Sequence, residues 1–178
     1  KEINPEYAGW ISGRNISYPM VQGADNEWYL THTFYGSANK AGCIFVDAQE
    51  EAGLDAPAVF IYGHNLKNDT MFAELMEYKN QEYYEENPAI WIYLPGETRE
   101  YWIFSVVEVP SDSWVYSCPS GESQEEWDTY IDNLQRASLV ETGILPGWGE
   151  QVILLSTCTN VGDGRLVVAA VKTPFISR

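Results

Sequence analysis

The sequence predicts a mainly β protein, a closed β-barrel with two or three short peripheral helices, one of which precedes the last hairpin. Short apolar or alternating runs recur along the whole chain, and Gly, Pro and Asn residues separate them. Only two or three segments have the periodicity of a helix. A β-sandwich would satisfy the same pattern, and we favour the barrel.

The chain is expected to form one domain over residues 1–178, since this length supports one sizeable core and is short for two. Apolar residues make up 45% of the sequence, which includes 7 Trp and 12 Tyr, so a disordered chain is excluded. Residues 1–8 are polar and are predicted to be an N-terminal lead-in, with a short helix around Pro5 that ends near Gly9.

Three strands are predicted in the first half of the chain. They are apolar or alternating runs at residues 16–21, 43–47 and 58–62. Gly and Asn on either side of His64 permit a sharp change of direction, so His64 is placed just beyond the end of the third strand. Residues 69–78 have apolar side chains at helical spacing and predict a short helix.

The next segments predict a hairpin and a longer helix. Residues 89–94 and 100–109 alternate as strands do, around a Pro-Gly turn at residues 95–96. Residues 123–126 form a capping box, and the apolar face that follows predicts a helix over residues 124–138.

The last two strands place two reactive side chains together. Residues 151–157 and 165–171 are apolar, β-branched runs joined by turn-forming residues, so they are expected to pair as an antiparallel hairpin. Cys158 follows the first strand and Arg165 starts the second, which brings a thiol beside a permanent cation. A nearby positive charge favours the thiolate and offers donors to an oxyanion, so this pair suits acyl transfer.

A cysteine nucleophile also needs a proton donor for the leaving amine, and His64 is the candidate. Each residue has an ordinary structural interpretation as well. Cys158 can be a buried thiol, His64 a turn residue with a local hydrogen bond, and Arg165 a surface charge. Cys43 and Cys118 are weaker candidates for a nucleophile. Cys43 is interpreted as a packing residue and Cys118 as a loop residue.

The charge of the chain limits its partners. Ten Lys and Arg against 26 Asp and Glu give a net charge of −16. This charge repels phosphate backbones and anionic lipid headgroups, so no nucleic-acid partner is expected.

The three cysteines are an odd number, so at least one is outside any intramolecular disulfide. There is no CxxC pair, and His32 and His64 have no metal-ligand spacing, so neither a disulfide scaffold nor a zinc site is predicted. No apolar stretch reaches the roughly 18 residues of a spanning helix, and no signal-peptide pattern opens the chain. Any membrane anchor of the natural protein is expected upstream of Lys1.

The chain resembles a known family through three motifs in a fixed order: Tyr62-Gly63-His64-Asn65, Leu155-Ser156-Thr157-Cys158-Thr159 and Arg165-Leu166-Val167-Val168. Together they are similar to the His, Cys and Arg motifs of sortases. Residues 9–11, 15–23 and 25–30 resemble the opening of class B sortases in particular, as does the helix before the last hairpin. The likeness runs from about residue 4 to residue 171.

The resemblance implies a sortase-type barrel of about eight strands and a cysteine transpeptidase of Gram-positive bacteria. It implies that Cys158 attacks the Thr carbonyl of an NPxTx-like sorting signal, that Arg165 stabilises the oxyanion, and that His64 protonates the departing amine. The thioester acyl-enzyme would then be resolved by an amine, usually of a peptidoglycan precursor.

The resemblance also implies substrate contacts at Asn26, Leu30, Ser156 and Thr159, together with residues of the 111–145 connection. It implies no cofactor and no metal, and it argues against calcium bound by acidic loop residues. The partners would be secreted proteins that carry a sorting signal, and the location would be the extracellular face of the bacterial cell membrane. The turn between Cys158 and Arg165 is shorter than in several class B relatives, which affects the shape of this groove wall.

Two alternatives remain open from the sequence. A pilus-assembling sortase would use a pilin lysine as the nucleophile, and nothing in the sequence separates the two acceptors. A non-catalytic cell-wall binding module would stack exposed Trp and Tyr side chains on sugars, and it would keep its activity after Cys158→Ala.

Overall fold

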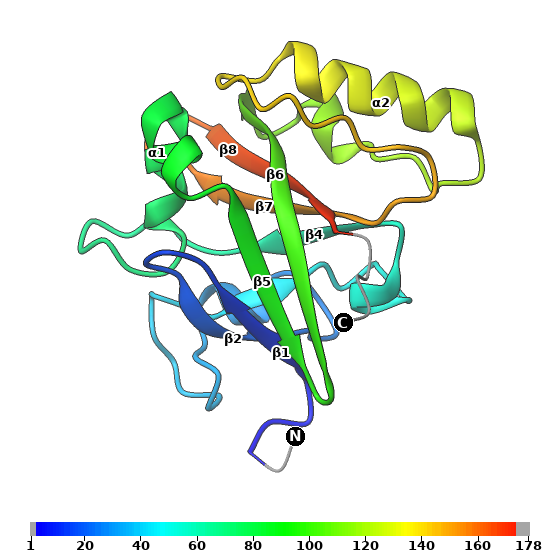
Figure 1. Ribbon diagram of the computed structural model, residues 1–178. Coiled ribbons are helices and arrows are strands. Elements are labelled where there is room, and N and C mark those ends of the chain that lie inside the picture. The colour runs from blue at the N-terminus through cyan, green and yellow to red at the C-terminus, as the bar shows by residue number, and fades with distance from the viewer. Residues whose placement is uncertain (1–2, 174–178) are drawn as a thin grey trace.

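The computed structural model describes residues 3–173, whose eight strands close into one barrel (Figure 1). Neighbouring strands follow the order β1-β2-β3-β4-β7-β8-β6-β5, and β5 pairs with β1 to complete the ring. The predicted barrel is therefore confirmed and the sandwich is set aside. The strands are β1 (Tyr7–Ser12), β2 (Ser17–Val21), β3 (Ile44–Val46), β4 (Ala58–Tyr62), β5 (Ala89–Leu94), β6 (Glu97–Pro110), β7 (Val152–Cys158) and β8 (Gly164–Lys172).

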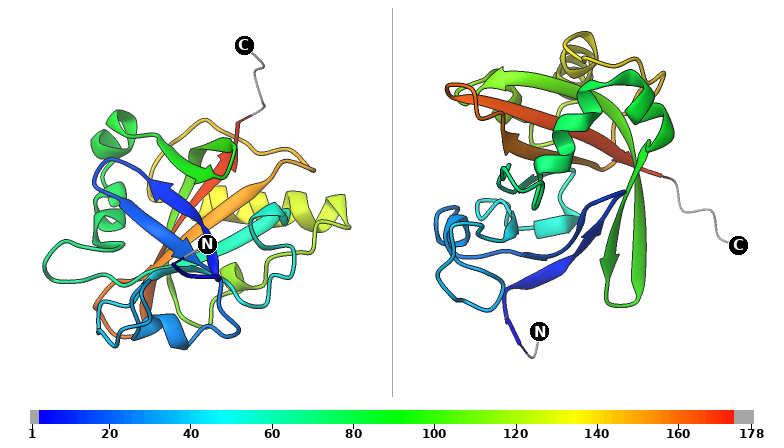
Figure 2. Two further views of the ribbon diagram at one scale, coloured as in Figure 1. Left: turned by 90° about the horizontal axis from the view of Figure 1, so that it is seen from below. Right: turned by 90° about the vertical axis from the view of Figure 1, so that its left-hand side faces the viewer.

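Short helices surround the barrel. The described residues contain the α-helices α1 (Gln81–Glu86) and α2 (Gln124–Arg136) and the 3-10 helices η1 (Trp28–Leu30), η2 (Gly53–Asp55), η3 (Ala73–Lys79) and η4 (Trp114–Tyr116). Within residues 3–173, none of these helices has the length and apolar character needed to cross a bilayer. Figure 2 shows the long β5–β6 hairpin running from the side near α1 to the opposite end of the molecule.

Two parallel pairs, β2–β3 and β4–β7, interrupt an otherwise antiparallel barrel. Parallel neighbours need a long crossover, and the chain between β4 and β7 supplies it with the β5–β6 hairpin and α2. Because β4 and β7 are parallel, both end at the same edge, where Tyr62 is paired with Ser156. Residues that follow the two strands therefore meet at this edge.

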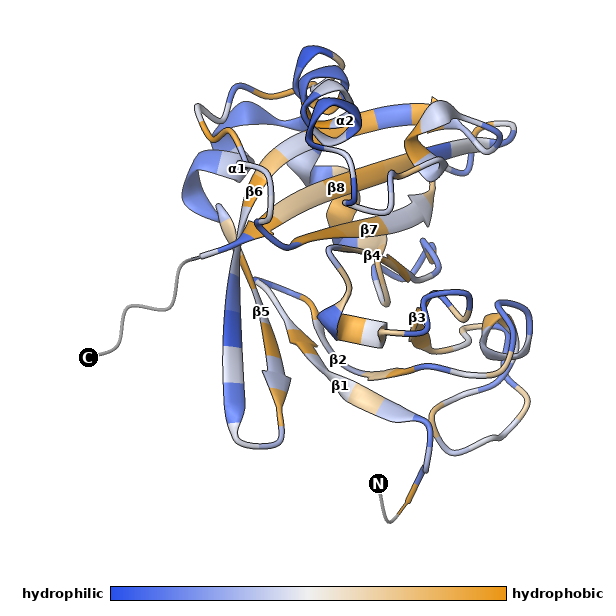
Figure 3. Ribbon diagram, turned by 90° about the vertical axis from the view of Figure 1, so that its right-hand side faces the viewer, coloured by the Kyte–Doolittle hydropathy of each residue, from blue (hydrophilic) through white to orange (hydrophobic). Residues whose placement is uncertain are grey.

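The strands β7 and β8 are buried on both faces, which explains why their sequences are nearly continuous apolar runs. On one face Leu155 and Val168 join the main core inside the barrel. On the other face Leu154 and Val167 join a second cluster that is covered by Trp127 of α2. Figure 3 shows the two strands coloured mostly as hydrophobic, next to the largely hydrophilic ribbon of α2.

The predicted helix near Pro5 is wrong. The side chain of Asn4 accepts a hydrogen bond from the Glu6 N–H (2.8 Å), and the Tyr7 N–H donates to the Asn4 carbonyl (3.2 Å), so these residues form a tight turn. Strand β1 then begins at Tyr7, inside the predicted lead-in, because its pairing with both β2 and β5 outweighs local preference. Residues 1–2 of that lead-in lie outside the described residues.

The predicted helix over residues 69–78 is wrong in its first part. Asp69 and Met71 have φ values of 59° and 61°, which a right-handed helix excludes. The Phe72 N–H donates to the His64 carbonyl (2.8 Å), so this segment folds back along the residues that follow β4. The helix η3 begins only at Ala73, and the sequence did not predict α1, which Asn80 caps with its side chain.

The remaining elements are close to their predictions. Strand β5 matches its predicted bounds, whereas β6 starts three residues earlier than predicted, directly after the turn at residues 95–96. Helix α2 starts where its capping box predicts, with the Ser123 side chain accepting from the Glu126 N–H, and ends two residues early. The predicted final hairpin is confirmed as β7–β8.

Candidate active site

The three side chains predicted to be reactive lie at the barrel edge where β4 and β7 end. Cys158 is the last residue of β7, His64 follows β4 by two residues, and Arg165 is the second residue of β8. All three are half-buried and line one pocket of about 240 Å³. The fold thus brings together residues that are up to about one hundred positions apart in the chain.

Cys158 and Arg165 are direct partners in the antiparallel ladder of β7 and β8. Opposed residues of a ladder project to the same face of the sheet, and both line the pocket. The guanidinium of Arg165 donates through Nη1 to the carbonyls of Asp163 (2.9 Å) and Gly164 (3.1 Å). These bonds hold the cation against the turn, beside the strand that carries the thiol.

His64 is fixed by its backbone and by its ring. Its carbonyl accepts from the Phe72 N–H, and Nε2 lies 2.7 Å from the Leu30 carbonyl. A carbonyl oxygen only accepts hydrogen bonds, so Nε2 carries a proton and Nδ1 is the nitrogen available for proton exchange. Gly63 makes this path possible, since a Cβ there would lie 2.4 Å from Ile44 Cδ1 and 2.7 Å from the Phe72 ring.

Three of the four residues predicted to contact substrate, Asn26, Leu30 and Ser156, line the same pocket. The fourth, Thr159, is buried in the β7–β8 turn, where its N–H donates to the Gly164 carbonyl (3.0 Å). A Cβ at position 164 would lie only 2.4 Å from the Thr159 hydroxyl oxygen. Thr159 therefore packs within the turn, apart from the described pocket lining.

Several residues of this site were not predicted from the sequence. Phe45, Tyr62, Gly63 and Thr157 also line the pocket. Asp47 joins two of its walls, because Oδ1 accepts from Asn26 Nδ2 (2.8 Å) and Oδ2 from the Tyr62 hydroxyl (3.0 Å). Tyr62 and Thr157 stand within the recognised motifs and were available as candidates, whereas no sequence pattern linked Asp47 to Asn26.

The connection between β6 and β7 reaches the pocket through Tyr116, whose hydroxyl lies 2.8 Å from Ser156 Oγ. Burial raises the pKa of Tyr116, so its hydroxyl stays protonated at neutral pH. Tyr116 also borders a second pocket of about 220 Å³, which contains the acidic side chains of Asp47 and Glu50. Tyr116 therefore joins the 111–145 connection to a residue that lines the pocket, and the predicted contribution of this connection to the substrate groove stays a prediction.

The pocket differs in charge from the rest of the protein. Among the described residues that line it, Arg165 is the only permanently charged one, although the chain carries a net charge of −16. Across residues 3–173, no group of three or more His, Cys, Asp or Glu side chains is arranged to hold a metal ion.

The other two cysteines are outside this pocket, and all three thiols are free. Burial raises the pKa of the Cys43 thiol to about 11, and it does the same for Cys118. Both remain protonated at neutral pH and are poor nucleophiles. Their positions in packing and in a loop agree with the interpretation from the sequence.

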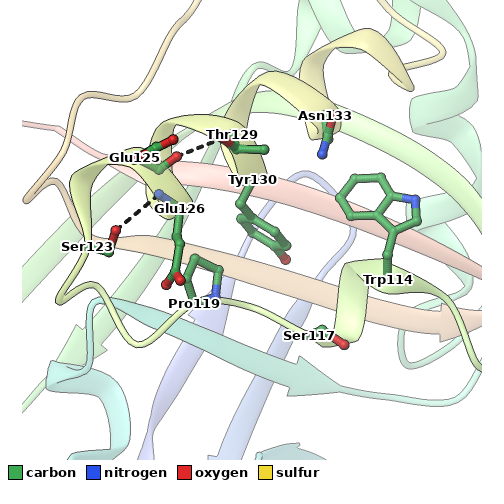
Figure 4. Close-up of a pocket in the computed structure, with 9 residues that line it drawn as sticks. All are labelled: Trp114, Ser117, Pro119, Ser123, Glu125, Glu126, Thr129, Tyr130 and Asn133. Carbon is green, nitrogen blue, oxygen red and sulfur yellow. Dashed lines mark hydrogen bonds between the residues drawn. The ribbon is translucent and has the colours of Figure 1, made fainter.

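A larger hollow of about 620 Å³ lies between η4 and α2 (Figure 4). Trp114 stands at one side of it and Tyr130 at its base, with Glu125 and Glu126 on the helix. Neither a cysteine nor a histidine is among the described residues that line it. The three side chains predicted to be reactive line the smaller pocket and not this hollow.

Comparison with known proteins identifies the family of this chain. The family model of the sortase domain matches residues 11–173. Sortase B of Listeria monocytogenes is 29% identical over 174 residues, which cover 94% of this chain and 70% of that relative. Sortase B of Staphylococcus aureus is 27% identical over 176 residues, which cover 96% of this chain and 71% of that relative.

Solved structures extend the comparison. Clostridium perfringens sortase B superposes with a TM-score of 0.90 and 32% identity, covering 98% of this chain and 97% of that one. A substrate complex of Staphylococcus aureus sortase B superposes with a TM-score of 0.89 and 25% identity, covering 98% of this chain and 82% of that one. A sortase B complexed with triglycine superposes with a TM-score of 0.89 and 25% identity, covering 98% of this chain and 83% of that one.

The chain belongs to the sortase family, whose members are cysteine transpeptidases that act on sorting signals and amines. Within that family it is a class B sortase, as the sequence motifs suggested. This assignment decides against the non-catalytic binding module.

Proposed function

We propose that Cys158 is the nucleophile, Arg165 the group that stabilises the oxyanion, and His64 the general acid and base. The observation that carries this assignment is the single pocket that all three line, with Cys158 and Arg165 paired across one ladder. A guanidinium beside a thiol both favours the thiolate and offers N–H donors to developing negative charge.

In the first half of the proposed reaction, the Cys158 thiolate attacks the Thr carbonyl of an NPxTx-like sorting signal. A C–S bond forms and the carbonyl electrons move to the oxygen, which Arg165 stabilises. As the oxyanion collapses, the C–N bond breaks and His64 Nδ1 gives its proton to the leaving amine. The product is a thioester acyl-enzyme.

In the second half, an acceptor amine attacks the thioester. His64 Nδ1 now takes a proton from the amine, the C–S bond breaks, and the thiolate of Cys158 is restored with a new amide as product. Water can replace the amine, which makes hydrolysis a slow side reaction. No cofactor enters either half of the proposed reaction.

The sorting signal is proposed to contact Asn26, Leu30 and Ser156, which surround the reactive residues. Thr159 is proposed to act on the signal only indirectly, through the turn that it packs against. We further propose that the acceptor is an amine of a peptidoglycan precursor, and the complex of a sortase B with triglycine supports an oligoglycine-like amine. A pilin lysine remains the alternative acceptor.

The proposed setting is the outer surface of a Gram-positive bacterium. There, residues 1–178 would form the single catalytic domain, attached by an upstream anchor to the extracellular face of the membrane. The sortase B relatives from Listeria monocytogenes and Staphylococcus aureus support this setting.

The test is cleavage of quenched fluorescent peptides that carry NPxTx-type or LPxTG-type signals, with triglycine or a lysine peptide as added amine. Wild type should cleave one signal class, and amine should divert the product from acid to amide. Cys158→Ala should abolish cleavage, and His64→Ala should reduce it by at least about 10²-fold. Equal cleavage by wild type and Cys158→Ala on every peptide would refute the proposed nucleophile.

A further inference from the structure

The backbone pairing of β4 and β7 stops just before the residues that perform the proposed chemistry. The register ends at Tyr62 and Ser156, with one further bond from the Gly63 N–H to the Ser156 carbonyl (3.2 Å). His64 and Cys158 each lie two residues past the last pair. The ladder that aligns the two strands therefore does not itself reach the two catalytic positions.

Side chains continue the connection where the ladder ends. Thr157 Oγ1 donates to the Gly63 carbonyl (2.7 Å), which precedes His64. Asn65 Nδ2 donates to the Cys158 carbonyl (2.9 Å), and Asn65 follows His64. His64 is thus bracketed by two bonds to the segment that carries the thiol, one from each neighbour.

The bond from Asn65 acts on the peptide unit that leaves Cys158. The oxygen of this unit accepts from Asn65, and its N–H, which belongs to Thr159, donates to the Gly164 carbonyl (3.0 Å). The orientation of the peptide plane is therefore fixed at both ends. The bond between Thr159 and Gly164 lies within the β7–β8 turn. The bond from Asn65 connects Cys158 to the segment that contains His64.

Asn65 is itself held in place. Its backbone pairs with Met71 in an isolated antiparallel bridge, and its carbonyl accepts from Asn160 Nδ2 (3.4 Å). It is half-buried and is not among the residues that line the catalytic pocket. Its direct link to the reactive residues is the side-chain bond to the Cys158 carbonyl, together with its place next to His64 in the chain.

We infer that Asn65 is a positioning residue, whose side-chain amide sets the distance and orientation of the Cys158 thiol relative to the His64 ring. This inference rests on the proposed roles of Cys158 and His64. An Asn side chain suits the position because a neutral amide can donate to a carbonyl oxygen, which an ionised carboxylate of the same shape cannot. A displacement of about 1 Å can cost about 10²-fold in rate, so one such bond is sufficient to matter.

The test compares Asn65→Ala and Asn65→Asp with a matched control, Asn68→Asp. Asn68 is exposed, lies three residues away and only accepts a bond from the Thr70 hydroxyl, so Asp can replace it and brings the same charge near the site. Asn65→Asp keeps the shape of the side chain, which preserves a folded protein if the alanine variant is unstable. Unfolding midpoints for all three proteins set the assay temperature below any transition.

Two readouts separate positioning from general destabilisation. The first is peptide cleavage, for which kcat in both Asn65 variants should fall by about 10- to 10²-fold while KM changes by less than about threefold. The second is the pH profile of iodoacetamide alkylation at Cys158, which needs no sorting signal. This profile should shift in both Asn65 variants and match wild type in Asn68→Asp.

Failure of the Asn65 inference can be distinguished from failure of the proposed function. If Cys158→Ala retains cleavage, the proposed function fails, whereas the alkylation profile still reports the pairing of the thiol with His64. Wild-type kcat and an unshifted alkylation profile in both Asn65 variants would overturn the inference. It would also be overturned if Asn68→Asp lost as much activity, or if the whole effect appeared in KM.

Discussion

Cys158 and Arg165 form the last residue pair of the β7–β8 ladder, directly beside the turn that joins the two strands. Opposed residues in an antiparallel ladder have Cα atoms roughly 4.5–5.5 Å apart. The thiol and the guanidinium are therefore neighbours because of strand register, and a slip of one residue would move one of them to the other face. The short turn makes such a slip difficult.

The first prediction concerns the cation of this pair. Arg165→Ala should lower kcat for peptide cleavage by about 10²- to 10³-fold, the usual loss when an oxyanion donor is removed. Arg165→Lys should recover only part of this loss, since an ammonium keeps the charge but lacks the planar fork that also bonds the carbonyls of Asp163 and Gly164. Steady-state cleavage assays measure both variants. Full activity in Arg165→Ala would exclude the proposed role.

Much of this arrangement was predictable from local sequence. The turn residues between two apolar runs predicted the final hairpin, and the hairpin alone places Cys158 beside Arg165. The capping box at Ser123 likewise predicted the start of α2. These elements were predictable because their determinants lie within a few residues of one another.

Other features depend on contacts between distant segments. The parallel pairing of β4 with β7 brings His64 to Cys158, and no local pattern predicts it. The left-handed conformations of Asp69 and Met71 exclude the first part of the predicted helix, because this segment folds back along the residues that follow β4. Asp47 and Asn26 form their hydrogen bond only because the tertiary fold brings them together. Strand register and side-chain networks between distant segments can be identified only once the structure is known.

The second prediction is that one thiol per chain reacts rapidly at neutral pH. Burial raises the pKa of Cys43 and Cys118 to about 11, so both stay almost entirely protonated at pH 7. Cys158 is half-buried in an open pocket beside a guanidinium. A maleimide probe followed by intact-mass spectrometry should therefore add one label to the folded wild type and none to Cys158→Ala over the same time. Two rapid labels on the wild type would contradict the prediction.

The third prediction concerns the close packing at Gly63. Gly63→Ala places a Cβ 2.4 Å from Ile44 Cδ1, in a region where Ile44 and Phe72 are fully buried. Overpacking of this kind should lower the free energy of unfolding by about 1–3 kcal/mol and displace His64. Denaturant unfolding and peptide cleavage measure the two effects.

Gly147→Ala is the matched control for this substitution. Gly147 is exposed, its backbone is outside the left-handed region, and a Cβ there meets nothing closer than 3.6 Å. Its stability and activity should equal those of wild type. If Gly63→Ala behaved like Gly147→Ala, the packing at the end of β4 would be looser than these distances indicate.

The fourth prediction is a pH dependence of stability that arises at Glu97. Arg99 Nε and Nη2 donate to the two carboxylate oxygens (2.8 and 2.9 Å), and Lys172 Nζ lies 3.2 Å from Oε1. These bonds, led by the one from Arg99, lower the pKa of Glu97 from 4.5 to about 2. Because the folded-state pKa lies below the unfolded one, the contribution is complete above about pH 4.5 and is lost as the pH falls toward 2.

Glu97→Gln isolates this contribution, since the amide keeps the shape but cannot ionise. Wild type should be more stable than Glu97→Gln at pH 6. The difference should shrink as the pH falls from 4.5 to 2, because Glu97 becomes protonated in the unfolded chain over this range while it is still largely ionised in the folded protein. Thermal unfolding midpoints across this range measure the difference. The side chain of Glu97 is 36% exposed, so salt should also reduce the effect. A difference that stayed constant from pH 6 to pH 2 would show that Arg99 stabilises the hairpin through packing and its bond to the Leu54 carbonyl, independently of the charge on Glu97.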